Sequence, residues 1–316
     1  MTENEVVEKL SNLYGFRVPR DFVKILLHVY AATRSAAADD SAEDSNFLYY
    51  LSFMFDLEGS IAKEFFDYSD WEDTMNWHFA YVNFPFELFP FGGPGIDGIS
   101  YGFVVHAPEL EAEDYPVGEF CPADGEGVFR LGENTRQGFE FMIARGLKHL
   151  SPEAINTFYE NKLTENDQLY WVNYRKRARR KAEKLAKLLD INPFNRKVEK
   201  KYRNRKVKPE IPKGWRFETS WDGIGALAPK DKFAPDYNHS EIPDFENIDE
   251  ELNFVRNFLR RGFPATALWV IRENYWESSF DEKYFAQLAP LWAESYEALN
   301  RPLLANRVFA ALEKRR

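Results

Sequence analysis

The chain has 316 residues, of which 44% are hydrophobic and 16% aromatic, so it is long and apolar enough to bury a core and is not a disordered protein. Its only cysteine, Cys121, excludes an internal disulfide and a metal site built from several thiolates. No run of about 18 apolar residues is present to span a bilayer, and residues 1–5 are acidic where a secretory signal is basic. We therefore expect a cytoplasmic protein with no membrane partner.

The net charge of -10 is unevenly distributed along the chain. Residues 175–208 contain 16 Lys or Arg and 3 acidic residues, a local charge of +13, so the remaining residues carry -10 minus 13, or -23. Such a basic segment can dock on the protein's own acidic surface, within one chain or across a homo-oligomer, or it can bind another acidic macromolecule. The sequence leaves these alternatives open.

Two helices are expected at the N-terminus. Residues 2–14 place Val6, Leu10 and other apolar residues on one stripe, and Gly15 ends the pattern. A second, short helix follows Pro19. Residues 31–45 are small and polar, which predicts an exposed loop.

The pattern changes at residue 79 to short strand-like runs separated by Gly, Pro and Asp. Proline interrupts the first of these runs at Pro85 and Pro90. Gly92 to Gly98 is predicted to be a structural turn and not a phosphate-binding loop, because a strand follows it where a phosphate site needs a helix N-terminus. A closing helix is expected over residues 134–147. The predicted strands cover residues 79–84, 99–106, 117–121 and 127–131.

This order predicts an α+β fold for residues 1–150, with a mixed or antiparallel sheet and flanking helices. A basic helical connector is expected over residues 151–212, with one long helix from Ser151 to residue 191. Residues 213–244 are predicted to hold a small hairpin and a Pro-rich linker. Residues 245–316 are predicted to be all helical.

The C-terminal segment predicts four helices, of which the second and fourth begin at Pro264 and Pro302. The spacing of these two prolines is similar to that of tetratricopeptide-like helical hairpins. Two hairpins are fewer than the three or so repeats that a free-standing array needs. We therefore expect them to pack on the rest of the protein.

The N-terminal half carries a distinctive combination of short segments after its helix pair. They are Val18-Pro19-Arg20-Asp21-Phe22, Leu88-Phe89-Pro90-Phe91-Gly92, Tyr101-Gly102-Phe103-Val104 and Tyr115-Pro116-Val117. This combination resembles the SUKH superfamily, which includes fungal cell-wall-assembly regulators and bacterial immunity proteins that neutralise toxins. The resemblance covers residues 1–147 and implies a domain that binds a partner protein.

The chain shows no spacing typical of a catalytic or metal site. Its five histidines lack the short spacings of metal ligands, and neither a nucleophile elbow nor a phosphate-binding loop motif is present. Pairs such as His106 with Glu109 are expected to have structural roles. The carboxylates between Glu111 and Asp114 are expected to form a solvated loop. We accordingly predict no catalytic residues, no metal and no cofactor.

The function predicted is a non-enzymatic protein-binding module, and the resemblance implies an immunity protein that binds and neutralises a toxin. An uncharacterised enzyme remains a further alternative. The residues predicted to contact the partner are Trp71, Trp77, Asp97, Tyr101, His106 and Asp124. The main alternative is a nucleic-acid-associated protein that binds phosphates through residues 175–208, with a basic patch of Arg175, Lys176, Arg177, Arg179, Arg180 and Lys181.

Overall fold

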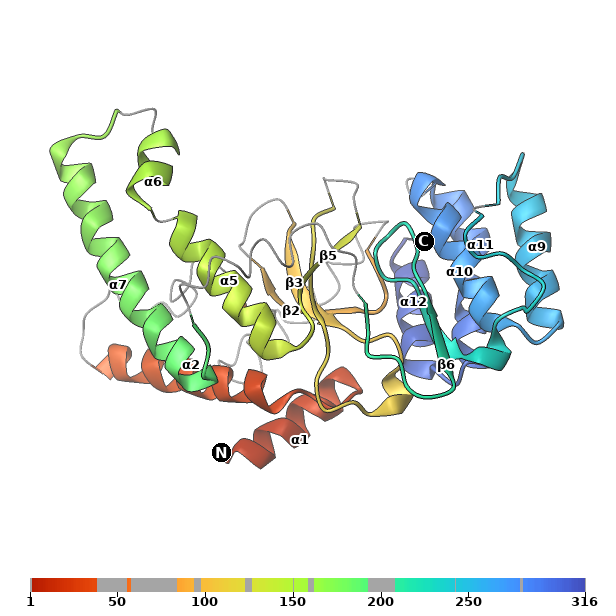
Figure 1. Ribbon diagram of the computed structural model, residues 1–316, viewed down its shortest axis with the longest axis horizontal. Coiled ribbons are helices and arrows are strands. Elements are labelled where there is room, and N and C mark those ends of the chain that lie inside the picture. Colours follow the sequence, from red (N-terminus) through yellow and green to blue (C-terminus); the bar gives the residue numbers. More distant parts are fainter. Residues whose placement is uncertain are drawn as a thin grey trace.

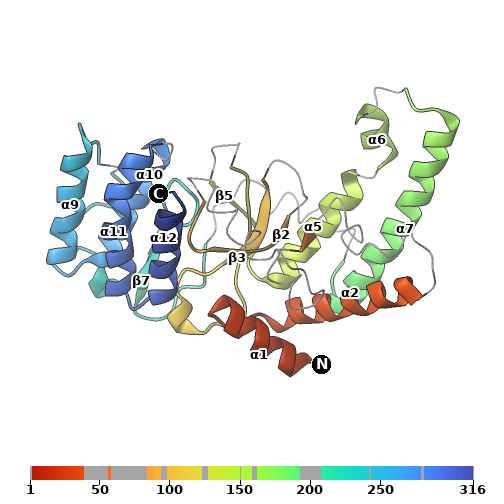
Figure 2. The same ribbon diagram turned by 180° about the vertical axis from the view of Figure 1, so that it is seen from behind.

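An antiparallel sheet forms the middle of the molecule, with a helical unit at each end (Figures 1 and 2). The computed structural model describes residues 2–38, 56–57, 84–93, 98–122, 127–149, 151–158, 162–192, 208–241, 243–278 and 281–315. Helices and strands together give the α+β class that the sequence predicts. In the described part of the chain, no helix is both long and apolar enough to cross a membrane.

The first two helices, α1 (Glu3–Tyr14) and α2 (Arg20–Ala38), pack on each other. Thr2 and Glu5 form a capping box that satisfies backbone N–H groups at the start of α1, and Gly15 ends the helix in the left-handed region with φ of 76°. The loop expected from residue 31 is wrong for residues 31–38. Alanine there has a high helix propensity and extends a helix that is already nucleated. Residues 39–45 lie outside the described residues.

The sheet has the strand order β1-β2-β3-β4-β5, and each neighbouring pair is antiparallel. Its strands are β1 (Asp56–Leu57), β2 (Leu88–Gly93), β3 (Ser100–Val104), β4 (Val117–Phe120) and β5 (Val128–Gly132). The break expected at Pro90 is wrong, since this residue lies within β2. A register shift between Pro90 and Gly92 accommodates a residue that has no N–H to donate. Phe84 lies outside any strand, and residues 79–83 are not described.

Helices α2 and α5 (Thr135–His149) pack on the sheet through aromatic side chains. Phe22 of α2 lies 5.1 Å from Phe103 of β3, and Phe91 of β2 is stacked on Phe139 of α5 at 5.6 Å. All four rings are fully buried. Burial of each large ring stabilises the fold by roughly 2 kcal/mol, so these contacts hold the helices to the sheet.

The single helix expected over residues 151–191 is two helices, α6 (Pro152–Phe158) and α7 (Glu165–Leu189). Thr164 and Asp167 form a capping box that starts α7 as a separate element. Its buried residues, Ala182, Leu185, Ala186 and Leu189, belong to the second half of the helix. That half packs on α2 and α5, while the first half extends away from the sheet (Figure 1).

The remaining chain forms the predicted hairpin and four helices. The hairpin pairs β6 (Trp215–Glu218) with β7 (Ala226–Pro229), followed by the short helix η4 (Lys230–Lys232). The helices are α9 (Ile248–Arg260), α10 (Pro264–Ser278), α11 (Glu282–Ala298) and α12 (Pro302–Lys314). They continue the core of the sheet, since Phe86 beside β2 meets Trp292 of α11 at 4.9 Å.

Candidate functional site

A pocket of about 820 Å³ opens beside the sheet. One wall is the loop after β3, which includes the short helix η3 (Pro108–Leu110), and the other includes residues 208–210 and the start of α5. The lining residues are Val104, His106, Ala107, Leu110, Ala112, Glu113, Asp114, Tyr115, Pro116, Arg130, Glu133, Asn134, Lys208, Pro209, Glu210 and Leu227. The pocket therefore combines apolar side chains with several charged groups.

His106 lines this pocket and is 4% exposed. Its Nε2 donates a hydrogen bond of 2.8 Å to the carbonyl oxygen of Ile224, in the loop between β6 and β7. Burial lowers the pKa of His106 to about 3, so the imidazole is neutral at physiological pH. The ring also meets Phe217 edge to face at 5.6 Å. His106 thus holds the hairpin loop against the pocket.

Asp114 connects the pocket wall to the start of α5. Its Oδ1 accepts hydrogen bonds from the backbone N–H of Tyr115 at 2.8 Å, and from the N–H and hydroxyl of Thr135 at 3.0 and 2.6 Å. Burial raises the pKa of Asp114, while the bonds from Thr135 act to lower it. The prediction of a solvated loop holds for Glu111 and Glu113, which are exposed, and is wrong for Asp114.

Tyr115 lines the pocket and carries a hydroxyl that no atom of the described residues hydrogen-bonds. The residue is 4% exposed, and its hydroxyl is buried without a hydrogen-bond partner. Burial raises the pKa of Tyr115 to about 12, so the hydroxyl stays protonated and remains a donor. Because buried polar groups are normally hydrogen-bonded, this hydroxyl is an exception among the described residues.

The charged residues around the pocket are predominantly acidic. The lining contains two basic residues, Arg130 and Lys208, and four acidic residues, Glu113, Asp114, Glu133 and Glu210. When fully ionised it therefore carries a charge of 2 minus 4, or -2. Arg130 is 8% exposed and lies 3.6 Å from Glu133. Glu113, Glu133 and Glu210 are exposed at the rim. This arrangement favours a ligand that presents a positive charge at the rim and apolar surface further in.

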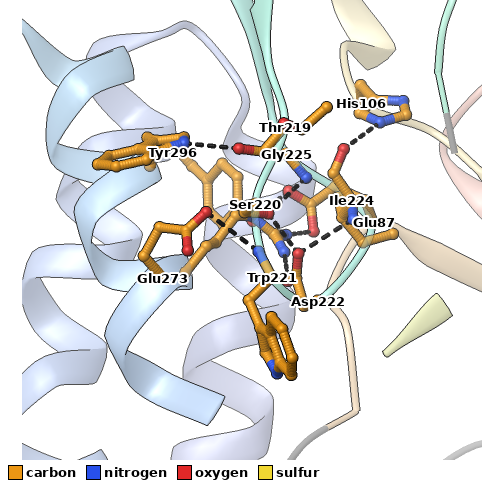
Figure 3. A network of polar contacts seen from close by, with 12 residues as sticks. Glu87, His106, Thr219, Ser220, Trp221, Asp222, Ile224, Gly225, Glu273 and Tyr296 are labelled. Carbon is orange, nitrogen blue, oxygen red and sulfur yellow. Dashed lines mark hydrogen bonds and ion pairs between the residues drawn. The ribbon is translucent and has the colours of Figure 1, made fainter. Parts of the chain in front are cut away.

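A buried network of charged side chains lies next to the pocket (Figure 3). Arg272 of α10 forms ion pairs with Glu87 and Asp222, and the Tyr296 hydroxyl donates to Glu87 at 2.6 Å. Burial opposes the charged form of Arg272, but the two carboxylates outweigh it and raise its pKa. Arg272 is 1% exposed, so its guanidinium is sealed from solvent.

The loop over residues 219–225 joins this network to the pocket (Figure 3). Asp222 Oδ1 accepts a hydrogen bond from the backbone N–H of Ile224 at 3.0 Å. The carbonyl oxygen of Ile224 accepts the hydrogen bond from His106. Ser220 accepts from the N–H of Gly225 at 2.7 Å, and Glu273 accepts from the N–H of Trp221 at 3.0 Å. The position of His106 in the pocket therefore depends on buried charges in the C-terminal helices.

The structure separates the residues predicted to contact a partner. His106 lines the pocket, whereas Tyr101 is 3% exposed in β3 and its hydroxyl accepts from Arg145 at 3.3 Å. Tyr101 is thus an interior residue and not part of an exposed contact surface. The other predicted contacts, Trp71, Trp77, Asp97 and Asp124, lie outside the described residues. The basic patch Arg175 to Lys181 lies on α7, away from the pocket.

Sequence patterns did not point to Tyr115, Arg130 or the network around Arg272. One signal was present: Arg272 ends the apolar run Ala267 to Ile271, and Glu87 stands between Phe86 and Leu88. A charged residue next to such an apolar run either points to solvent, because of the helix or strand periodicity, or is buried with a partner of opposite charge. Only the fold shows which residue that partner is.

Among the described residues, no group of three or more His, Cys, Asp or Glu is arranged to hold a metal ion. No protein-family model matches the chain, and no curated protein matches its sequence.

Proposed function

We propose that the protein is a non-catalytic protein-binding module that uses the pocket beside His106 to receive a positively charged segment of its partner. One observation carries this proposal: the pocket has an acidic rim, while its deepest titratable groups are committed to holding the backbone. His106 bonds the Ile224 carbonyl, and Asp114 bonds the start of α5. The lowered pKa of His106, about 3, also makes its neutral imidazole a weak base at physiological pH.

A lysine or arginine side chain of the partner matches the chemistry of this pocket. Its aliphatic stem packs on apolar lining such as Leu110 and Leu227, and its charged end meets the carboxylates at the rim. The unsatisfied hydroxyl of Tyr115 is covered in the free protein, and it hydrogen-bonds an oxygen of the same segment once binding moves the side chains that cover it.

The resemblance of residues 1–147 to the SUKH superfamily supports an immunity role within this proposal. In that role, the partner is a basic toxin, and occupation of its surface by this protein blocks its activity. The acidic rim matches such a partner in charge.

Affinity capture with matched variants tests the proposal. Glu113→Lys combined with Glu210→Lys reverses the rim charge at two exposed positions, and Glu294→Lys combined with Glu297→Lys makes the same charge change on an exposed face of α11. We expect a basic protein that is retained by the unchanged chain and by the α11 variant but lost with the rim variant. If every retained protein binds the rim variant equally well, the pocket is not the contact site and the proposal is wrong.

A further inference from the structure

The first half of α7 bears an exposed band of aromatic and apolar side chains. Within the described residues 162–192, none between Glu165 and Lys181 is fully buried, and the fully buried positions begin at Ala182, on the side where Trp171 and Tyr174 are half-buried. Leu169 is 61% exposed, Tyr170 56% and Val172 45%. Side chains of this kind on a solvated helix indicate a binding surface.

Three rings, of which Tyr170 is exposed and Trp171 and Tyr174 are half-buried, form a cluster on the helix. Tyr170 and Tyr174 are stacked with their centroids 6.1 Å apart, and Trp171 meets each of them edge to face at 5.5 and 5.6 Å. One turn further along, six of the seven residues from Arg175 to Lys181 are basic, and four of those six are arginines. Lys176 and Arg180 are exposed, and Arg179 pairs with Glu183 at 2.9 Å. Rings and cations thus follow each other directly along one helix.

We propose that this part of α7, residues 169–181, binds single-stranded nucleic acid. Bases stack on the Tyr170, Trp171 and Tyr174 rings, and the adjoining arginines and lysines contact the phosphates. Arginine is suited to this role because its planar guanidinium both donates bidentate hydrogen bonds to phosphate and stacks on rings. The site lies on a different element from the pocket and does not depend on the proposed function of the pocket.

Other occupants fit the same surface less well. Successive helix positions are about 100° apart, so Leu169 and Val172 share one side, while Tyr170 lies about 100° or more from both. The three therefore do not make the single apolar face of a membrane-surface helix. A second copy of α7 would bring two sets of six cations together, which is repulsive. An acidic protein would satisfy the cations but would not use the rings as stacking platforms.

The acidic remainder of the chain does not prevent this binding. A helix of 25 residues is about 37 Å long, and its packed part is confined to the end that contacts α2 and α5. Figures 1 and 2 show α7 at the opposite end of the molecule from α9 to α12. The Debye length at physiological ionic strength is about 8 Å, so acids on the distant helices are screened from the first half of α7.

Fluorescence anisotropy with the full-length protein tests the proposal. The probes are labelled single strands of about 20 deoxythymidines or uridines, a duplex of similar length and a polyglutamate chain, each at about 50 and about 200 mM salt. We expect both single strands to bind more tightly than the duplex, whose bases are unavailable for stacking. Preference for the uridine strand assigns RNA as the ligand, and preference for the thymidine strand assigns DNA.

Two sets of variants separate charge from stacking. The triple variant Lys176→Gln, Arg177→Gln and Arg180→Gln is expected to weaken binding at least tenfold. It is also expected to reduce the slope of log affinity against log salt concentration by about 2, since each phosphate contact on a single strand contributes about 0.7 to that slope. Tyr170→Ala with Trp171→Ala is expected to weaken binding about tenfold or more with the salt slope unchanged.

The control removes three exposed cations elsewhere, through Arg256→Gln, Arg260→Gln and Lys283→Gln, and is expected to bind like the unchanged chain. Circular dichroism confirms that each variant is folded. Three results overturn the proposal: no binding at low salt, binding that survives both sets of α7 variants, and polyglutamate binding as tight as that of the single strands. The last result assigns an acidic protein as the occupant.

Discussion

Arg272 in α10 forms an ion pair with Glu87, which precedes β2 and lies 185 residues earlier in the chain. The two side chains are 0% and 2% exposed. Asp222, from the hairpin loop, binds the same guanidinium. One buried arginine therefore joins the N-terminal sheet, the hairpin and the C-terminal helices, and it fixes the loop that positions His106.

Loss of Arg272 is expected to be severe for stability. Arg272→Met leaves Glu87 and Asp222 buried without their counterion, and removal of one partner from such a pair costs about 3 to 5 kcal/mol in the free energy of unfolding. Urea denaturation measures this change. Arg256→Met, at an exposed position on α9, is the control and is expected to change the free energy by less than about 0.5 kcal/mol. Equal effects of the two substitutions would show that the buried pairs do not hold the units together.

Gly223 is expected to tolerate no side chain because the hairpin loop touches β5 through its backbone. Its φ is 81°, and a Cβ at this position would lie 2.5 Å from the carbonyl oxygen of Val128. Gly262 has nearly the same φ, 82°, but open space around it, so Gly262→Ala is a matched control. We expect Gly262→Ala to cost about 1 to 2 kcal/mol from backbone strain and Gly223→Ala about 1 to 3 kcal/mol more. Comparable losses in thermal denaturation would contradict the close approach.

Local patterns in the sequence predict most helices and strands but not how they are joined. The spacing of Val6 and Leu10 predicts α1, and the prolines Pro264 and Pro302 correctly mark the starts of α10 and α12. Errors arise where local preference is ambiguous, as in the alanines of α2 and at Pro90, whose bulge depends on β3 beside it. Tertiary context decides such cases.

The candidate site is predicted less well, because it is assembled from distant segments. His106 was selected from the sequence and does line the pocket, but its bond to Ile224 spans 118 residues. Nothing near Tyr115 in the sequence shows that its hydroxyl ends without a partner. Trp171 and Tyr174 lie at helical spacing from the buried Ala182, Leu185 and Leu189, yet they are only half-buried, which the spacing alone does not reveal.

Glu251 is expected to make stability fall as the pH rises. Burial raises the pKa of Glu251 from 4.5 to about 7. The hydrogen bond of 2.5 Å that Glu251 accepts from the Tyr284 hydroxyl acts to lower the pKa but is the smaller effect. The folded state thus holds a proton that the unfolded state releases, so the contribution of Glu251 is complete below about pH 4.5 and is lost as the pH rises to about 7. This loss is on the order of 3 kcal/mol.

Denaturation of Glu251→Gln at about pH 5 and about pH 8 measures this effect. The variant is expected to gain stability relative to the unchanged chain at the higher pH and little at the lower one. The measurement compares the two proteins at each pH because His106 acts in the opposite direction. Its pKa is lowered by folding, so its contribution to stability is lost as the pH falls. Glu297→Gln, on the exposed face of α11, is expected to show no such dependence. A constant difference at both pH values would mean that Glu251 is ionised throughout.

Tyr115→Phe separates the stability of the protein from its binding function. The substitution removes a buried hydroxyl that has no partner within the protein, so the free energy of unfolding is expected to stay the same or rise by up to about 1 kcal/mol. If the hydroxyl hydrogen-bonds the partner, affinity for the captured protein falls by about 5- to 100-fold, the equivalent of about 1 to 3 kcal/mol. Titration calorimetry with that protein measures the change.

The control for Tyr115→Phe is Tyr237→Phe, since Tyr237 also has a pKa raised to about 12 by burial but lies in the C-terminal unit, where its hydroxyl donates to the Glu241 carbonyl. That substitution is expected to leave binding unchanged. A Tyr115→Phe protein that is as stable as the unchanged chain and binds the partner equally well would remove the hydroxyl from the contact site. Because an unsatisfied hydroxyl has no structural role in the free protein, reduced binding at undiminished stability is specific to a role in recognition.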